Sequence, residues 1–202
     1  MGYARGIPTT TTQLLNDLRD NANRQAWAEF DRRYRPIIHG VAARLGLRPE
    51  DASDVAQQTI SDFIRDYQRG SYDRGKGRLR TWLKGIARNR AIDVMRTETR
   101  RLERPAGDAL SDAPAESTIN ELWEQEERTA IVAAAMQELR DGDTSESVIK
   151  AFELAFWRKM PVEQVAAECG MSVDSVHQAR TRVVRRLNPI IKRLSAAYSD
   201  DL

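Results

Sequence analysis

The chain has 202 residues, of which 41% are hydrophobic and 31% charged, and its formal net charge is +2. No apolar run approaches the ~18 residues of a membrane span, so no such span is expected. Residues 1–15 contain no sustained apolar region, so secretion is not expected either. The expected location is the cytoplasm. The single Cys169 excludes an intramolecular disulfide and a cysteine-cluster metal site.

The charges are distributed unevenly along the chain. Residues 1–104 carry 21 basic and 13 acidic side chains, residues 105–147 carry two and eleven, and residues 148–202 carry nine and six. This basic, acidic, basic order is typical of two modules that face a polyanion and are joined by a segment that stays off it.

Helical patterns dominate the first half of the chain. Residues 1–11 are expected to form a flexible tail, and a short helix follows from residue 12. A longer helix is expected over 25–45, with a kink or local break at Pro36, and a third over 49–67. Strand patterns are absent from the whole sequence, so the predicted fold class is all-α.

Residues 73–101 contain the strongest signal. Apolar residues recur at three- and four-residue steps from Leu79, which predicts an amphipathic helix. Arg80, Lys84 and Arg88 are spaced i, i+4 and i+8 and so lie along one exposed stripe of that helix. Residues 74–104 hold eleven basic and three acidic side chains, which suits contact with a polyanion. Charge alone leaves the solvated face of a helical bundle equally open.

Two aromatic residues flank this stripe. Trp82 is a candidate for stacking on a base, but its place on the apolar face favours core packing. Tyr72, in the glycine-rich loop before the helix, is the freer aromatic side chain.

Linker composition marks residues 105–118. Thr118 and Glu121 have the spacing of a capping box that opens a helix to about Leu139, and a further helix is expected over 146–158.

Residues 161–187 have the spacing of a helix-turn-helix. Ala166 is small enough for two helices to approach, Gly170 supplies the tight turn, and Val176 packs back from the second helix. Ser172 is expected to cap that second helix. An ordinary helical hairpin is the alternative. The chain is therefore divided into a tail (1–11), a first helical domain (12–104), a linker (105–118), a second helical domain (119–195) and a tail (196–202).

Three motifs in this order resemble the bacterial RNA polymerase sigma factors of the sigma-70 family, in the compact extracytoplasmic-function (ECF) branch. They are DASDVAQ at 51–57, LRTWLKGIARNRAID at 79–93, and the helix-turn-helix. The resemblance covers residues 12–195 and implies a domain 2-like bundle followed by a domain 4-like helix-turn-helix. It implies a transcription initiation factor that binds core polymerase and recognises the −10 and −35 promoter elements.

The resemblance also implies three groups of site residues. The clamp helices of the largest polymerase subunit would be bound by Asp51, Asp54, Gln57, Gln58 and Asp62, where Gln58 replaces the family's frequent Glu. The −10 element would be bound by Tyr72, Arg80, Lys84, Arg88, Asn89, Arg90, Arg96, Arg100 and Arg101, with Asn89 at the base pocket. The −35 element would be bound by Ser175, His177, Gln178, Arg180, Thr181, Arg182, Arg185 and Arg186.

Further partners follow from the same resemblance. The second domain would also contact the polymerase flap. Because proteins of this branch commonly have an anti-sigma partner, an anti-sigma protein is a further candidate partner. His177 and Gln178 differ from the pair common in the family, so the promoter sequence does not carry over.

Two other classes of protein remain to be compared with this prediction. An enzyme is not expected, because the sequence contains no P-loop, metal-ligand cluster or nucleophile elbow, and no cofactor or metal is predicted. A helix-turn-helix regulator that binds duplex DNA without polymerase explains the C-terminal module equally well. It leaves the more basic helix of the first domain unexplained.

Overall fold

The computed structural model describes residues 11–20, 22–73, 75, 77–101 and 114–198. Every regular element of these residues is an α-helix, which confirms the predicted all-α class. The chain divides into two compact units, the first over Met1–Ala130 and Ser199–Leu202, the second over Ile131–Tyr198. In the described part, no helix is both long and apolar enough to cross a membrane.

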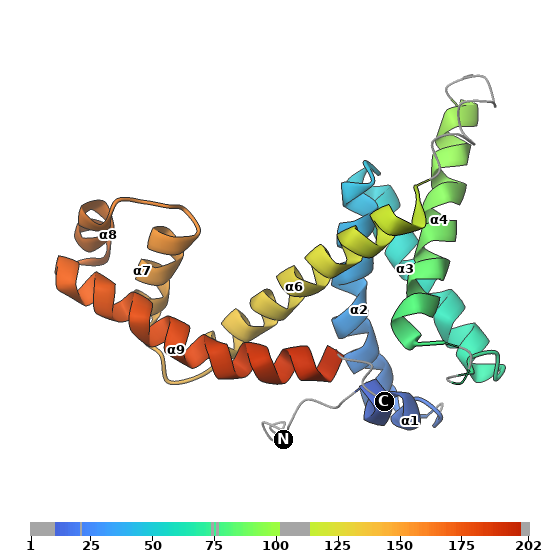
Figure 1. The fold of residues 1–202 in the computed structure, drawn as a ribbon, viewed down its shortest axis with the longest axis horizontal. Coiled ribbons are helices and arrows are strands. Elements are labelled where there is room, and N and C mark those ends of the chain that lie inside the picture. The colour runs from blue at the N-terminus through green and yellow to red at the C-terminus, as the bar shows by residue number, and fades with distance from the viewer. Residues whose placement is uncertain (1–10, 21, 74, 76, 102–113, 199–202) are drawn as a thin grey trace. The chain divides into compact units, whose positions relative to one another are not determined.

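The first unit is a helical bundle (Figure 1). Helices α1 (Thr11–Asp17), α2 (Arg24–Arg44), α3 (Pro49–Gln68) and α4 (Leu79–Arg101) follow one another in sequence, and α3 packs on both α2 and α4. The side chain of Asn23 accepts a hydrogen bond from the Ala26 amide and caps α2, and Gly46 ends that helix at a φ of 88°. The helix α2 continues through Pro36, so the expected local break is absent.

Aromatic side chains hold this bundle together. The rings of Phe30 on α2 and Phe63 on α3 stack with centroids 4.3 Å apart, and both side chains are fully buried. Trp27 meets both rings edge-on. These contacts fix α3 against α2 and so set the face that α3 offers to α4.

The second unit contains the C-terminal part of α6 (Glu116–Arg140), then α7 (Glu146–Phe156), α8 (Val162–Cys169) and α9 (Val173–Tyr198). The buried residues Val165 and Ala166 of α8 and Val176 of α9 belong to one core. Gly170 lies between the two helices in the left-handed conformation, with a φ of 62°. The Ser172 hydroxyl accepts a hydrogen bond from the Ser175 amide. The two predicted helices, the tight turn between them and the Ser172 cap are confirmed.

Three further details differ from the sequence analysis. The helix α6 begins at Glu116, so Thr118 lies inside it and the predicted capping box is wrong. The two units meet within α6, after Ala130, whereas the sequence predicted a second domain from residue 119. The helix α9 reaches Tyr198, which is buried, so residues 196–198 are not a tail. Residues 1–10, 105–113 and 199–202 of the predicted tails and linker lie outside the described residues.

Candidate nucleic-acid and partner interfaces

A groove between α3 and α4 brings together part of the predicted polymerase-binding set. Asp51, Asp54 and Gln58 line this groove, which has a volume of about 330 Å³, and Asp93 and Glu98 line it from α4. We call it the α3–α4 groove. Asp54, Gln57 and Gln58 are exposed, whereas Asp51 is half-buried and pairs with Arg48 at 2.8 Å. The groove is rich in carboxylates and accessible, as a protein partner with basic side chains would require.

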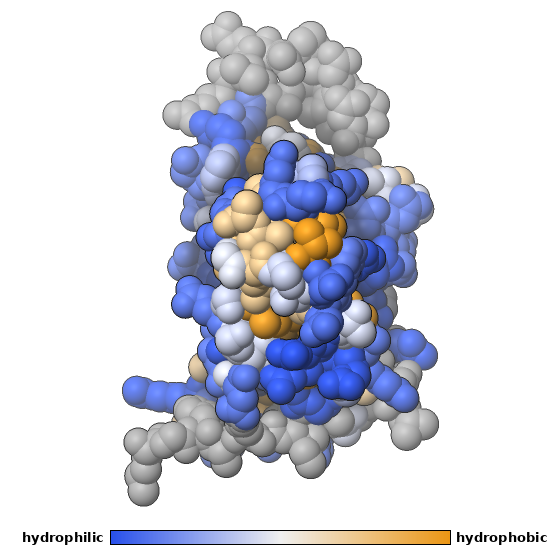
Figure 2. All heavy atoms as spheres, turned by 90° about the vertical axis from the view of Figure 1, so that its left-hand side faces the viewer, coloured by the Kyte–Doolittle hydropathy of each residue, from blue (hydrophilic) through white to orange (hydrophobic). Residues whose placement is uncertain are grey.

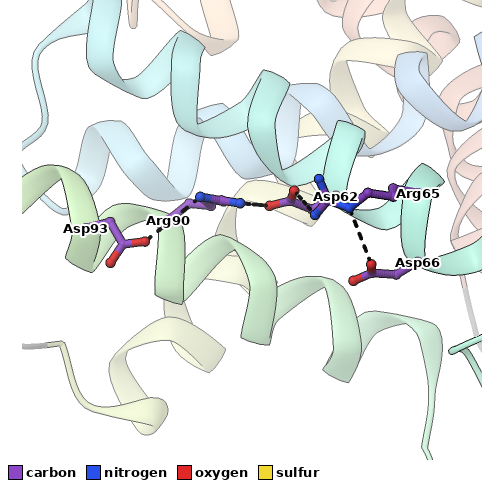
Figure 3. Close-up of polar contacts among 5 residues, drawn as sticks. All are labelled: Asp62, Arg65, Asp66, Arg90 and Asp93. Carbon is purple, nitrogen blue, oxygen red and sulfur yellow. Dashed lines mark hydrogen bonds and ion pairs between the residues drawn. The ribbon is translucent and has the colours of Figure 1, made fainter.

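Asp62 is placed differently from the other four residues of that set (Figure 3). Its side chain is only 7% exposed, and one carboxylate oxygen accepts a hydrogen bond from Arg90 of α4 at 2.5 Å. The other oxygen accepts from Arg65, which also approaches Asp66 at 3.7 Å. Asp62 and Arg90, predicted for two different interfaces, are therefore bound to each other.

The three cations predicted to form one stripe, Arg80, Lys84 and Arg88, do so on α4; we call them the basic stripe. Each is in contact with the segment 114–127, the cover segment. Arg80 pairs with Glu127 at 3.2 Å, and the Lys84 ammonium donates to the Asn120 side chain at 2.8 Å. Arg88 donates to the backbone carbonyl of Pro114 at 3.0 Å.

The contact with the cover segment changes the environment of Lys84, the central cation of the stripe. Burial lowers the pKa of the Lys84 ammonium below its usual value, and the neighbouring Arg80 guanidinium lowers it further. Glu124, Glu127 and Glu116 act in the opposite direction. Lys84 is thus a partly desolvated cation beside an acidic helix.

A second pocket, the loop pocket, lies between residues 71–77 and the first half of α4 and has a volume of about 400 Å³. Its lining includes the predicted base-pocket residue Asn89, which is exposed, together with Tyr72 and Trp82. The rings of Tyr72 and Trp82 stack with centroids 5.0 Å apart and planes 11° from parallel. Trp82 also meets Phe63 edge-on and is half-buried, so it serves the core and the pocket wall together.

The remaining −10 residues are at the far end of α4. Arg96 is half-buried there, and Arg100 and Arg101 lie on the helix, although their side chains are outside the described set. Thr81 and Gly85, which the sequence analysis did not select, line the loop pocket from the same helix. Thr81, Gly85 and Asn89 follow one another at steps of four residues, and this helical spacing was the signal that could have identified the first two.

In the second unit, α9 exposes most of the predicted −35 residues. These exposed side chains are His177, Gln178, Arg180, Thr181, Arg182, Arg185 and Arg186. Ser175 is half-buried, and its hydroxyl lies 2.8 Å from that of Ser172. Arg186 donates to the Thr144 hydroxyl at 2.6 Å, which ties the middle of α9 to the loop before α7. Arg180, Arg182 and Arg185 are then the cations available to phosphates.

Apolar side chains also gather on the surface of this unit. The view of Figure 2 looks onto α8 and the start of α9, and it shows an apolar area surrounded by hydrophilic side chains. Phe156 and Trp157 at the end of α7 are 52% and 47% exposed. The ring of Phe156 stacks on the buried Phe152 at 5.2 Å, so it is held in place while exposed. Exposed, ordered aromatic side chains are typical of protein-binding surfaces.

Among the described residues, no group of three or more His, Cys, Asp or Glu side chains is placed to hold a metal ion. The candidate sites are therefore a carboxylate-rich groove, an aromatic pocket, a cationic stripe and an exposed recognition helix.

Comparison with known proteins agrees with this arrangement. The model of sigma-70 region 2 matches residues 30–101, which include α3, α4, the α3–α4 groove and the loop pocket. An ECF RNA polymerase sigma factor, RpoE, from Cereibacter sphaeroides is 24% identical over 170 residues, 83% of this chain and 87% of that protein. The ECF RNA polymerase sigma factor SigK of Mycobacterium sp. (strain KMS) is 25% identical over 185 residues, 90% of this chain and 92% of that protein. SigK of Mycolicibacterium vanbaalenii is 24% identical over 191 residues, 93% of each chain. The chain is thus similar to sigma-70 region 2 over residues 30–101, and to ECF RNA polymerase sigma factors along nearly its whole length.

Proposed function

We propose that this protein binds core RNA polymerase, directs it to specific promoters and holds the −10 element open, with the residues assigned below. The observation that carries the proposal is the loop pocket. A stacked aromatic pair and the exposed amide of Asn89 line one cavity beside the basic stripe. Such a combination suits an unpaired base whose strand continues along a row of cations.

Polymerase binding is assigned to the α3–α4 groove. Asp54 and Gln58 are exposed there and can reach basic or amide groups of a partner, while Asp51 is already paired with Arg48. Gln57 is exposed on α3 but does not line the groove. Asp62 takes a different role in this proposal: it positions Arg90 across the two helices. In this proposal α3 provides the surface that faces polymerase, and the Asp62–Arg90 pair fixes the position of α4 relative to α3.

Opening of the promoter requires no hydrolysis by this chain. A base that leaves the duplex loses its stacking, at a cost of a few kcal/mol, and a pocket that supplies a new stacking surface offsets that loss. Tyr72 and Trp82 supply the aromatic surface, and the Asn89 amide offers both hydrogen-bond donors and an acceptor to the base edge. Arg80, Lys84 and Arg88 would hold the phosphates of the same strand.

The second unit would place α9 in the major groove of the −35 element. His177 and Gln178 lie in its N-terminal half, where recognition helices contact base edges, and Arg180, Arg182 and Arg185 are exposed for phosphates. Phe156 and Trp157 are the residues we assign to the polymerase flap, because they are ordered, aromatic and exposed.

Transcription with purified core polymerase tests the proposal. The protein and core enzyme are incubated with a library of upstream DNA fragments, and start sites are mapped. Asp54→Ala is expected to weaken association with core, and Asn89→Ala to leave association intact while reducing open complexes, detected by permanganate reactivity of unpaired thymines. Asp66→Ala, on α3 but away from the groove, is the matched control for Asp54→Ala.

One result would replace the proposal with its rival. If the protein never associates with core polymerase and still protects specific duplex DNA alone, it is a helix-turn-helix regulator. The loop pocket would then have no part in its function.

A further inference from the structure

The basic stripe is covered by the chain itself. Its three cations meet three successive points of the cover segment in antiparallel order: Arg80 with Glu127, Lys84 with Asn120, and Arg88 with the Pro114 carbonyl. Figure 1 shows the N-terminal end of α6 beside α4. All these residues belong to the first unit. These contacts with the cover segment extend along the whole basic stripe, which is about two turns of α4 long.

Buried apolar side chains anchor the segment in this register. Ile119 and Trp123 are 2% and 0% exposed, and they lie between the polar contacts along α6. The Trp123 indole N–H also donates to Glu127 at 3.2 Å, which orients that carboxylate toward Arg80. Asn120, Trp123 and Glu127 recur at steps of three and four residues, so one face of α6 provides all three.

A second helix also accommodates the segment. Glu126 pairs with Arg44 of α2, and its side chain lies directly over Gly40 of the same helix. A Cβ atom at Gly40 would stand 2.1 Å from a Glu126 carboxylate oxygen, so a larger residue at position 40 would require the Glu126 side chain to move. The Glu126 side chain thus gives the segment a further contact, on α2.

We propose that the cover segment is an intramolecular competitor of DNA, which occupies the basic stripe in the free protein and must leave it before the strand can bind. The inference rests on the proposed function, in which the same cations hold phosphates. A guanidinium or ammonium that is bound to Glu127, Asn120 or Pro114 has fewer donors for a phosphate. Residues 114–130 carry five acidic side chains and one basic, so the segment presents the same sign of charge as the DNA that would replace it.

Two variants measure the competition in the full chain. Asn120→Ala/Glu127→Gln removes two of the three contacts, and Glu121→Gln removes the same charge from an exposed position of the same helix. Binding of a fluorescent single-stranded oligothymidylate is followed by anisotropy. We expect the double variant to bind about three- to tenfold more tightly than the wild type, as the loss of two partly exposed contacts implies, and Glu121→Gln to change affinity less than twofold. An equal gain in both variants would show a general charge effect and overturn the inference.

A reversible lock supplies the second test. Gly40→Cys/Glu126→Cys in a Cys169→Ser background places two thiols where Cβ and side chain already touch, and neither residue belongs to the stripe. The oxidised protein should bind the oligonucleotide at least about fivefold more weakly than the same protein after reduction. Its slope of log affinity against log salt should be shallower by about 2, the value for three lost phosphate contacts on a single strand. Equal affinities in the two redox states, or failure of the disulfide to form, would overturn the inference.

A Lys84→Gln substitution in the reduced Gly40→Cys/Glu126→Cys protein separates two hypotheses: that the basic stripe binds DNA, and that the cover segment competes with DNA for it. If Lys84→Gln weakens binding while the lock has no effect, the stripe binds DNA and only the competition is wrong. If Lys84→Gln has no effect in the reduced protein, the stripe is not a DNA surface, and the assignment of these cations in the proposed function fails together with the inference.

Discussion

Arg90 of α4 donates a hydrogen bond to Asp62 of α3 at 2.5 Å, so one ion pair joins the helix with the predicted polymerase-binding residues to the helix with the predicted DNA-binding residues (Figure 3). Asp62 is 7% exposed, whereas Arg90 is 38% exposed. The carboxylate is therefore the buried member of the pair, and it depends on Arg90 and Arg65 for its hydrogen bonds.

Asp62→Ala should loosen the contact between α3 and α4, because it leaves two guanidinium groups without their shared partner. We expect the first unit to lose about 1–3 kcal/mol of its free energy of unfolding, less than a fully buried pair would lose, since both arginines reach solvent. Urea unfolding followed by tryptophan fluorescence in a Trp157→Phe background measures this unit. Asp66→Ala, which removes only the 3.7 Å contact with Arg65, should cost less than about 0.5 kcal/mol. Equal losses in the two variants would contradict this account.

Gly85→Ala should separate stability from function. Gly85 lies inside α4, and a Cβ atom there would meet nothing within 4 Å. Alanine should therefore stabilise the helix by about 0.5–1 kcal/mol. The added methyl group would nevertheless stand on the lining of the loop pocket, so open-complex formation should fall while the unfolding midpoint rises. Unchanged permanganate reactivity of the promoter would argue against a base in this pocket.

Tyr72→Ala tests the aromatic wall. Tyr72 is half-buried in a loop and stacks on Trp82, so its loss should cost the fold little but remove one side of the pocket. Base–aromatic stacking is worth about 1–3 kcal/mol, so opening at a fixed promoter should fall about fivefold or more. Tyr72→Phe keeps the ring and should restore opening. If the phenylalanine variant is as defective as the alanine one, the hydroxyl and not the ring is what matters.

Gly170→Ala should destabilise the second unit through backbone conformation alone. The φ of 62° is costly for a residue with a Cβ atom, yet nothing within 4 Å would clash with that atom. The expected loss is about 1–2 kcal/mol, and Gly170→Asn should lose less because asparagine adopts this conformation more readily. Thermal unfolding monitored at Trp157 distinguishes the two variants. Equal losses for alanine and asparagine would indicate a steric cause instead.

The lowered pKa of Lys84 predicts a dependence on pH with a definite sign. Because the pKa is lower in the folded chain than in the unfolded one, Lys84 loses its proton first in the folded state as pH rises. Between the two pKa values the unfolded state binds more protons, so this group's contribution to stability increases with pH. The free energy of unfolding of the wild type should therefore rise relative to that of Lys84→Met as pH approaches 10.5, the usual value for lysine. A constant difference, or a change of the opposite sign, would contradict the burial of the ammonium.

The all-α class, the positions of the helices and the helix-turn-helix followed from local features of the sequence. Apolar periodicity identifies a helix, and Gly170 and Ser172 act on their immediate neighbours, so distant residues do not alter their effect. Pro36 and Thr118 show the limit of local reasoning. Helix α2 continues through the proline, and α6 begins before the threonine, because packing of a whole helix can outweigh a single unfavourable or capping residue.

The assignment of side chains to surfaces required the tertiary structure. From the sequence alone, Asp62 is predicted to be one more exposed acidic residue of its helix. Only the packing of α4 on α3 brings Arg90 to it. Trp82 can be assigned from periodicity to the core, but its stacking on Tyr72 depends on the path of the loop. In the same way, the sequence determined that Arg80, Lys84 and Arg88 share one stripe, since helical spacing is local. That Glu127, Asn120 and Pro114 lie against them was decided by the docking of α6, a contact between residues about 26 to 47 positions apart that no local pattern encodes.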